Sequence, residues 1–286
     1  EVMALNMAGA AAKGACVYVT LEPCSHTGKT PPCADALIAA GVSRVVVALR
    51  DPNPLVAGQG LARLAQAGIQ VEQGLLAEAA REHHKGFLSR MIRGRPWLRL
   101  KTAASLDGRI ALNNGQSKWI TGAAARSDVQ RWRARSCAVI TGVATVIADD
   151  PQLNVREFAQ TRQPWKVILD SAMNTPLNSQ ILRQDKVLIV AAKDTERRSA
   201  LEQTGAAVLV LGGNDGRVDL HAVCCELARR GCNEVMIEAG GTLAGAFLQA
   251  QLVDEVILYQ APVFLGEGLP LARFELTQLD AKLAPK

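Results

Sequence analysis

The chain has 286 residues, of which 49% are hydrophobic, 21% are charged and only 4% are aromatic. This composition is that of a globular protein and excludes a disordered, collagen-like or disulfide-stapled chain. The sequence contains no run of about 18 apolar residues, so no membrane span is predicted. The 32 basic and 27 acidic residues give a net charge of +5, which suits a protein that handles phosphorylated small molecules and is too small to indicate nucleic-acid binding by itself.

The first third of the chain predicts short helices and strands in alternation. Helices are expected at residues 1–13, 34–40, 61–67 and 75–92, and strands at 15–20, 44–49 and 69–72. A loop rich in Pro, Gly, Ser and Thr spans residues 22–32, and Gly41 ends the helix that follows it. This alternation predicts a mostly parallel sheet with helices on its faces.

The stretch Arg93-Gly94-Arg95-Pro96 is the best predicted domain boundary, because the alternation restarts after it. At roughly 150 residues per domain two domains are expected, at residues 1–94 and 95–286. Strands are expected at residues 97–103, 137–142, 165–170, 186–191, 206–211, 234–239 and 254–260, with one more after 265–266. Helices are expected at 121–134, where Thr121 is the predicted cap, at 220–230 and after 240–241. The two halves are therefore predicted to be different α/β domains.

Seven cysteines and the first residues of the chain bear on its location. The cysteine count is odd, and residues 1–4 lack the basic and apolar segments of a secretory signal. A reducing cytoplasm is therefore expected, with cysteines acting as metal ligands or small core residues. Because the chain lacks an initiator Met and opens within a predicted helix, we expect the natural protein to extend upstream of Glu1 and to be longer at its C-terminus.

The segment PCSHTGKTPPC, residues 23–33, holds two cysteines around a loop that ends at a predicted helix start. A helix N-terminus favours thiolate, the form that binds zinc, and a catalytic zinc keeps its fourth position for water. Eight residues between two cysteines is not a standard finger spacing, so two unrelated cysteines are the alternative. Zinc deaminases carry H-x-E on one helix and P-C…C at the start of the next, with a strand between them. Glu1, the strand and Cys24…Cys33 follow that order.

This segment, together with the DPNP of residues 51–54, resembles the deaminase half of the RibD family of bifunctional riboflavin-biosynthesis enzymes. The resemblance implies a cytidine-deaminase-like three-layer domain that binds Zn²⁺. It implies Glu1 as the proton shuttle, Cys24 and Cys33 as zinc ligands, and Lys29, Asp51 and Asn53 as substrate contacts. The zinc-binding His of the family would fall two residues before Glu1, so two alternatives are open: the natural chain extends upstream and supplies this His, or the deaminase half is inactive. Ordinary turn chemistry is an equal alternative for Asp51 and Asn53.

The second half of the chain carries a different set of motifs. No G-x-G-x-x-G follows a strand, and the glycines of residues 212–216 indicate a turn, so a Rossmann domain is not supported. The segment EAGGTLAGA, residues 238–246, predicts a strand, a double glycine and a helix whose first N–H groups could hold a pyrophosphate. A plain turn, with Gly245 allowing close helix packing, is the alternative.

With LKTAASLDGR at 100–109, SKWIT at 117–121, RWRA at 131–134 and GVATVIADDPQLNVR at 142–156, this segment resembles the reductase half of the same family. The resemblance implies a dihydrofolate-reductase-like α/β domain that uses NADPH. The implied cofactor contacts are Ala103, Trp119, Thr145, Asp149, Ser171, Gly240, Gly241, Thr242, Leu243, Ala244, Gly245 and Ala246. The implied substrate contacts are Ser117, Arg133, Leu153, Arg156 and Glu238.

The chemistry of these residue types suits the implied reaction. Arg133 and Arg156 could grip a ribose 5-phosphate bidentately, although surface arginines are the alternative. Asp149 is the candidate proton donor, with Lys101 as its electrostatic or proton-handling partner. The neighbouring Asp150 is either a like charge that would raise the pKa of the Asp149 carboxyl group or a residue that caps a turn.

The predicted function is hydrolytic deamination of 2,5-diamino-6-(5-phosphoribosylamino)pyrimidin-4-one, followed by NADPH-dependent reduction of its ribosyl to a ribityl group. The predicted partners are this phosphoribosylated pyrimidine and NADPH, without nucleic acid or membrane, and a homo-oligomer is left open. One alternative is a reductase with an incomplete deaminase half. Another is a zinc-stabilised RNA-binding module, against which the lack of interleaved basic and aromatic residues counts.

Overall fold

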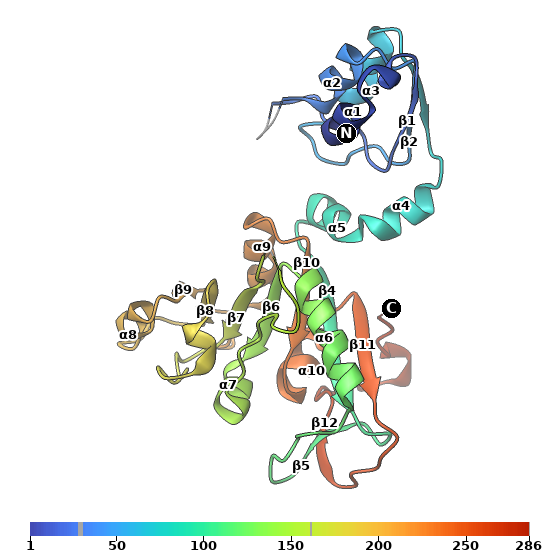
Figure 1. Ribbon diagram of the computed structural model, residues 1–286. Helices are drawn as coiled ribbons and strands as arrows, with labels where there is room; N and C mark the ends of the chain where they lie inside the picture. Colours follow the sequence, from blue (N-terminus) through green and yellow to red (C-terminus); the bar gives the residue numbers. More distant parts are fainter. Residues whose placement is uncertain (28–30, 161, 286) are drawn as a thin grey trace. The chain divides into compact units, whose positions relative to one another are not determined.

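The computed structural model describes residues 1–27, 31–160 and 162–285 (Figure 1). The chain divides into two units, Glu1–Arg93 and Gly94–Lys286. Among the described helices, none has the length and apolar character needed to cross a membrane.

The first unit is built on a three-stranded parallel sheet with the order β1-β2-β3. Its elements are α1 (Val2–Ala8), a 3₁₀ turn (Gly9–Ala12), β1 (Cys16–Val19), α2 (Cys33–Ala39), β2 (Arg44–Val47), α3 (Gln59–Gln66), β3 (Gln70–Gln73), α4 (Ala77–His83) and α5 (Lys85–Arg93). Leu37, Val45 and Leu64 are fully buried where α2 and α3 pack on β2. The single helix predicted at 75–92 is wrong, because His84 leaves helical geometry and separates α4 from α5.

The second unit contains a seven-stranded, all-parallel sheet with the order β11-β4-β10-β6-β7-β8-β9. Its strands are β4 (Trp97–Ala104), β6 (Ala138–Gly142), β7 (Trp165–Leu169), β8 (Val187–Ala191), β9 (Ala207–Val210), β10 (Glu234–Glu238) and β11 (Glu255–Gln260). Its helices are α6 (Ala123–Arg135), α7 (Val143–Asp149), α8 (Arg198–Gln203), α9 (Leu220–Arg229) and α10 (Gly241–Gln249), with 3₁₀ turns at Gln180–Arg183 and Leu279–Ala281. A separate antiparallel pair joins β5 (Arg109–Leu112) to β12 (Gly268–Pro270).

The core explains why the strands of this sheet are nearly continuous apolar runs. Successive residues of a strand point to opposite faces, and a parallel sheet is covered on both. Ile140 of β6 accordingly belongs to one buried cluster, with Leu98 and Val167, whereas its neighbour Val139 belongs to another, with Ile168. Both faces of the central strands are therefore closed by side chains.

Three short elements were not predicted and one predicted cap is wrong. β5, α7 and α8 have no counterpart among the predicted elements, while β12 is the strand expected after residues 265–266. Thr121 does not cap α6: the N-cap is Gly122, which makes no side-chain bond, and the Thr121 carbonyl accepts a hydrogen bond from the Arg126 guanidinium.

The strand order determines where a site can form. β10 follows β9 in sequence but lies between β4 and β6, and pairs in register with both. Gly142, Leu169 and Glu238 close β6, β7 and β10 at the carboxyl edge of the sheet (Figure 1). In open parallel sheets, ligands bind outside this edge where the strand order reverses.

Candidate functional site

In the first unit, three of the predicted residues lie together. The backbone N–H of Cys33, the first residue of α2, donates to Cys24 Sγ at 3.3 Å, and the Cys33 side chain also contacts the Glu1 carboxyl group. Burial, with the neighbouring Glu1 and Cys24 side chains, raises the pKa of the Cys33 thiol to about 12. The strand–loop–helix order of the sequence therefore brings Glu1, Cys24 and Cys33 to one place.

This cluster does not by itself make a catalytic zinc site. Such a site takes three protein ligands and one open position. Cys24 and Cys33 supply two thiols, and the part of the chain that the structure describes contains no group of three His, Cys, Asp or Glu side chains that could hold a metal ion. The residues present therefore do not fit a complete catalytic zinc centre.

A buried carboxylate anchors the loop that carries two further predicted residues. Glu22, only 3% exposed, accepts hydrogen bonds from the backbone N–H groups of Asp51, Gly58, Gly60 and Leu61 at 3.1, 3.0, 3.0 and 3.3 Å. Through these four hydrogen bonds, Glu22 holds the loop before α3 in place beside the segment that leads to Cys24.

Within that loop, the two predicted substrate residues make the local hydrogen bonds of a turn. Asp51 Oδ1 accepts the Asn53 N–H at 2.8 Å, and Asn53 Oδ1 accepts the Leu55 N–H at 3.1 Å. Burial raises the pKa of Asp51. The third predicted substrate residue, Lys29, lies outside the described residues.

In the second unit, a buried ionic cluster joins three of the predicted residues. The Arg133 guanidinium of α6 donates twice to Glu238, from Nε to Oε1 at 2.6 Å and from the second terminal nitrogen to Oε2 at 3.0 Å. Lys101 Nζ, on the strand beside β10, lies 3.6 Å from Glu238 Oε2. Burial would raise the pKa of Glu238, but Arg133 and Lys101 outweigh it and lower that pKa to about 2.

In this cluster, Lys101 and Arg133 have partners that the sequence did not predict. Lys101 was expected to assist Asp149, but it pairs with Glu238, its register partner across β4 and β10. Asp149 instead lies 3.8 Å from Lys118. Arg133 was expected to offer its guanidinium to a phosphate, but two of its donors are already used by Glu238.

Of two other expected substrate residues, one is buried and one is exposed. Leu153 is 3% exposed and packs in the core on the Val139 side of the sheet, so its side chain does not present a contact surface. Arg156 is exposed, and a terminal nitrogen of its guanidinium donates to Asn154 Oδ1 at 3.4 Å.

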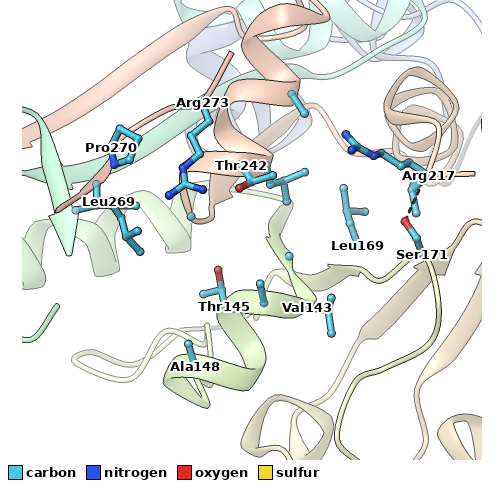
Figure 2. Close-up of a pocket in the computed structure, with 18 of the residues that line it drawn as sticks. Val143, Thr145, Ala148, Leu169, Ser171, Arg217, Thr242, Leu269, Pro270 and Arg273 are labelled. Atoms are coloured by element: carbon cyan, nitrogen blue, oxygen red, sulfur yellow. Dashed lines mark hydrogen bonds between the residues drawn. The ribbon is translucent and has the colours of Figure 1, made fainter. Parts of the chain in front are cut away.

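A cavity of about 1100 Å³ opens at the carboxyl edge of the sheet (Figure 2). It is lined by nine of the residues that the resemblance implied: Ser117, Thr145, Asp149, Ser171, Gly240, Gly241, Thr242, Leu243 and Ala246. The expected cofactor residues Ala103, Trp119, Ala244 and Gly245 are not among its lining residues. Trp119, 70% exposed, lines a neighbouring cavity of about 650 Å³, which shares Ser117 and Asp149 with the first.

Close packing accounts for the glycines inside α10. A Cβ atom on Gly245 would lie 1.9 Å from the Arg273 carbonyl oxygen, and one on Gly241 would lie 2.3 Å from that of Pro270. Only glycine at these two positions therefore lets the helix approach the backbone at the end of β12 and just after it so closely. Gly240 differs, because the nearest atom to its Cβ position, Thr145 Oγ1, is 4.0 Å away, so the start of α10 is open to the cavity.

Sequence reasoning missed two arginines in this cavity. Arg217, in the loop between β9 and α9, and Arg273, after β12, both line it (Figure 2). The glycines of residues 212–216 indicated only a turn. A basic residue directly after such a turn, between a strand and a helix of a parallel sheet, is the signal that could have identified Arg217.

The comparisons with known proteins agree with this division of the chain. The model of the RibD C-terminal domain matches residues 96–284, and that of the cytidine and deoxycytidylate deaminase zinc-binding region matches residues 1–49. The riboflavin biosynthesis protein RibD of Escherichia coli K12 is 49% identical over 278 residues, covering 93% of this chain and 75% of that relative. This chain belongs to the RibD family.

Solved structures of RibD proteins have the same fold. RibD from Acinetobacter baumannii matches with a TM-score of 0.91 at 46% identity, covering 99% of this chain and 79% of that one. A diaminohydroxyphosphoribosylaminopyrimidine deaminase/5-amino-6-(5-phosphoribosylamino)uracil reductase from Thermotoga maritima matches with a TM-score of 0.82 at 31% identity, covering 94% and 74%. A deaminase-like unit followed by a RibD reductase unit is therefore the architecture of this chain.

Proposed function

We propose that this chain catalyses two successive steps of riboflavin biosynthesis. The first 94 residues deaminate 2,5-diamino-6-(5-phosphoribosylamino)pyrimidin-4-one, and residues 95–286 reduce its ribosyl to a ribityl group with NADPH. The order of the two family matches and the activities in the name of the Thermotoga maritima protein support this proposal. The observation that carries it is the large cavity at the carboxyl edge of the sheet, lined by a double glycine, hydroxyl groups and two arginines.

The residues around this cavity suit a nicotinamide dinucleotide. Its volume, about 1100 Å³, lies at the upper end of the range for ligand sites. The first N–H groups of α10 have no partner within the helix, and Gly240 leaves their approach open, so they suit the pyrophosphate. Thr145 and Ser171 offer hydroxyl groups to the rest of the cofactor. When bound, NADPH supplies the hydride that reduces the sugar carbon.

The ionic cluster beside the cavity suits the phosphoribosyl group of the substrate. Glu238 is held ionised by two cations, so the three charges sum to +1 and favour an approaching phosphate. Arg156 is exposed and adds a second guanidinium from the segment after α7. We assign Glu238 and Lys101 to orienting the sugar, and Arg133 to holding Glu238.

Proton transfer is assigned to the carboxyl group where the two cavities meet. The sugar ring must open before reduction, and its oxygen takes up a proton as the ring opens. Asp149 lines both cavities and lies 3.8 Å from the Lys118 ammonium group. We assign proton delivery to Asp149, with Lys118 in the role that the sequence suggested for Lys101.

For the deaminase half, we assign Glu1, Cys24 and Cys33 to the reactive centre. Asp51 and Asn53, with Lys29, are assigned to substrate contacts. Among the described residues, the two thiols of this centre are not joined by a third metal-binding side chain.

The reductase proposal is tested by NADPH oxidation with 5-amino-6-(5-phosphoribosylamino)uracil as substrate. The expected result is loss of absorbance at 340 nm in step with formation of the ribityl product, and a Lys118→Gln variant that lowers kcat more than KM. Wild-type protein that leaves NADPH unoxidised would overturn the proposal.

One alternative is a chain that carries out the reduction alone, because the described residues include no group of three His, Cys, Asp or Glu side chains that could hold a metal ion. Ammonia release from the diaminopyrimidinone ribosyl phosphate, with zinc present and NADPH absent, separates the two functions. Release supports both activities in this chain. Its absence from protein that oxidises NADPH would assign the reduction alone.

A further inference from the structure

The loop between β9 and α9 holds Arg217 on an ordered backbone. Gly212 and Val218 form an antiparallel bridge, and the Gly213 N–H donates to the Arg217 carbonyl at 2.7 Å. The Val218 N–H donates to Ser171 Oγ at 3.3 Å, which ties the loop to the end of β7 (Figure 2). Arg217 therefore extends from a base that is fixed on both sides.

The guanidinium of Arg217 lines the cavity and forms no ion pair within the part of the chain that the structure describes. Among the described residues, no carboxylate forms an ion pair with it and no acceptor binds it, whereas Arg133 in the same unit engages Glu238 twice. The acid of the same loop, Asp215, also lines the cavity, but its Oδ1 accepts the Arg217 backbone N–H at 3.0 Å. A guanidinium with free donors facing a cavity is suited to bind a phosphate bidentately.

The cavity has a second, separate place for an anion. The start of α10, with Gly240, Gly241 and Thr242, offers backbone N–H groups, and Arg273 lies beside Thr242 and Pro270 (Figure 2). Arg217 lies elsewhere on the lining, beside Ser171 (Figure 2). The cavity therefore offers two anion sites, one at a helix start and one at the end of β7.

A dinucleotide with one pyrophosphate needs only the first of these sites. The other anionic group of a nicotinamide dinucleotide is the 2′-phosphate that distinguishes NADPH from NADH. An arginine accommodates that phosphate, whereas an unengaged acid favours the free 2′-hydroxyl.

We propose that Arg217 binds the 2′-phosphate of the cofactor and thereby makes the reductase prefer the phosphorylated dinucleotide. This inference rests on the proposed function, because it assumes that the cavity binds a nicotinamide dinucleotide. Removing a hydrogen-bonded charge pair between Arg217 and this phosphate is expected to weaken NADPH binding about 10- to 100-fold.

The test compares the Kd of NADPH with that of NADH, measured by calorimetry, for wild type and three variants. Arg217→Gln is expected to weaken NADPH binding about 10- to 100-fold and to leave NADH binding within about twofold. Arg217→Lys keeps the positive charge but lacks the planar guanidinium, so its affinity for NADPH is expected to lie between those of wild type and Arg217→Gln. Arg273→Gln is the matched control, a second exposed arginine of the same cavity, and should change both affinities by the same factor.

The outcomes separate this inference from the proposed function. Equal weakening of NADPH and NADH by Arg217→Gln, or an unchanged preference for NADPH, would overturn the inference and leave the reductase intact. Wild-type protein that binds neither dinucleotide at millimolar concentration would overturn the proposed reductase itself. Since the Arg217 side chain is exposed, Arg217→Gln is expected to keep the wild-type unfolding midpoint, which tryptophan fluorescence checks.

Discussion

Each of the two units buries a carboxylate near its predicted site residues, and the two units neutralise that carboxylate in different ways. Glu22 in the first unit is surrounded by four backbone N–H groups. Glu238 in the second is neutralised by two side-chain cations, Arg133 and Lys101. Backbone dipoles hold a loop in one shape, whereas full side-chain charges also create an electrostatic field that acts on a charged substrate.

This difference predicts unequal costs when each carboxylate becomes an amide. In the second unit, two cations would remain buried without their partner, which is more costly than losing hydrogen bonds to neutral N–H groups. Tryptophan fluorescence can separate the units, because all four tryptophans lie in the second: Trp97, Trp119, Trp132 and Trp165.

The largest effect is expected for Glu238→Gln. The free energy of unfolding of the second unit should fall by about 3–5 kcal/mol, since Arg133 and Lys101 are left as uncompensated charges. The measurement is urea denaturation followed by tryptophan fluorescence. Glu202→Gln is the matched control, because Glu202 pairs with Arg198 on an exposed helix and should cost less than about 0.5 kcal/mol. A cost for Glu238→Gln within about 1 kcal/mol of the control would show that the cluster contributes little.

The next largest effect is a pH dependence of the free energy of unfolding of the second unit. The pKa of Glu238 is lowered from 4.5 to about 2, so the folded state binds its proton less readily than the unfolded state. The stabilisation is present above pH 4.5 and is lost as the pH falls toward 2, at about 3 kcal/mol in total. Unfolding free energies measured across this window should show a slope that Glu238→Gln removes. An identical slope in the variant would assign the acid sensitivity to other groups.

The smallest effect is expected for Glu22→Gln in the first unit. An amide nitrogen would face N–H donors, so the loop before α3 should loosen by about 2 kcal/mol. Amide exchange at Gly60 and Leu61 should accelerate roughly 30-fold, while the urea midpoint reported by tryptophan stays unchanged. Glu78→Gln is the control in the same unit, because Glu78 pairs with Arg81 in an exposed position on α4. Unchanged protection at Gly60 would mean that Glu22 does not hold the loop.

The same contrast explains how much of each site could be predicted. Glu1, Cys24 and Cys33 were recognisable because they follow the helix, strand and loop order of zinc deaminases within 33 residues, and in the structure they are neighbours. The strands around them follow from simple apolar runs, so most strand positions were also predicted correctly.

The second site is assembled from distant segments, and the local pattern does not contain its pairings. Lys101 and Glu238 are partners only because β10 lies beside β4 in one register, which no single segment specifies. The helix α7, which carries Thr145 and Asp149, was missed because its Val, Thr and Ile residues have low helix propensity. Arg273 has no motif around it, and Arg217 is marked only by its place directly after a glycine turn, so neither could be assigned to a site before the cavity was defined.

The late position of β10 also has a consequence for how the protein is made. The ribosome releases β4 and β6 before β10, yet these two strands acquire a common neighbour only when residues 234–238 emerge. Until then the sheet remains in two separate parts, with unpaired backbone groups along the gap. Because such long-range pairing is slow, the reductase unit completes its fold near the end of synthesis. A nascent chain that stops before β10 exposes two unpaired strand edges that are prone to aggregation.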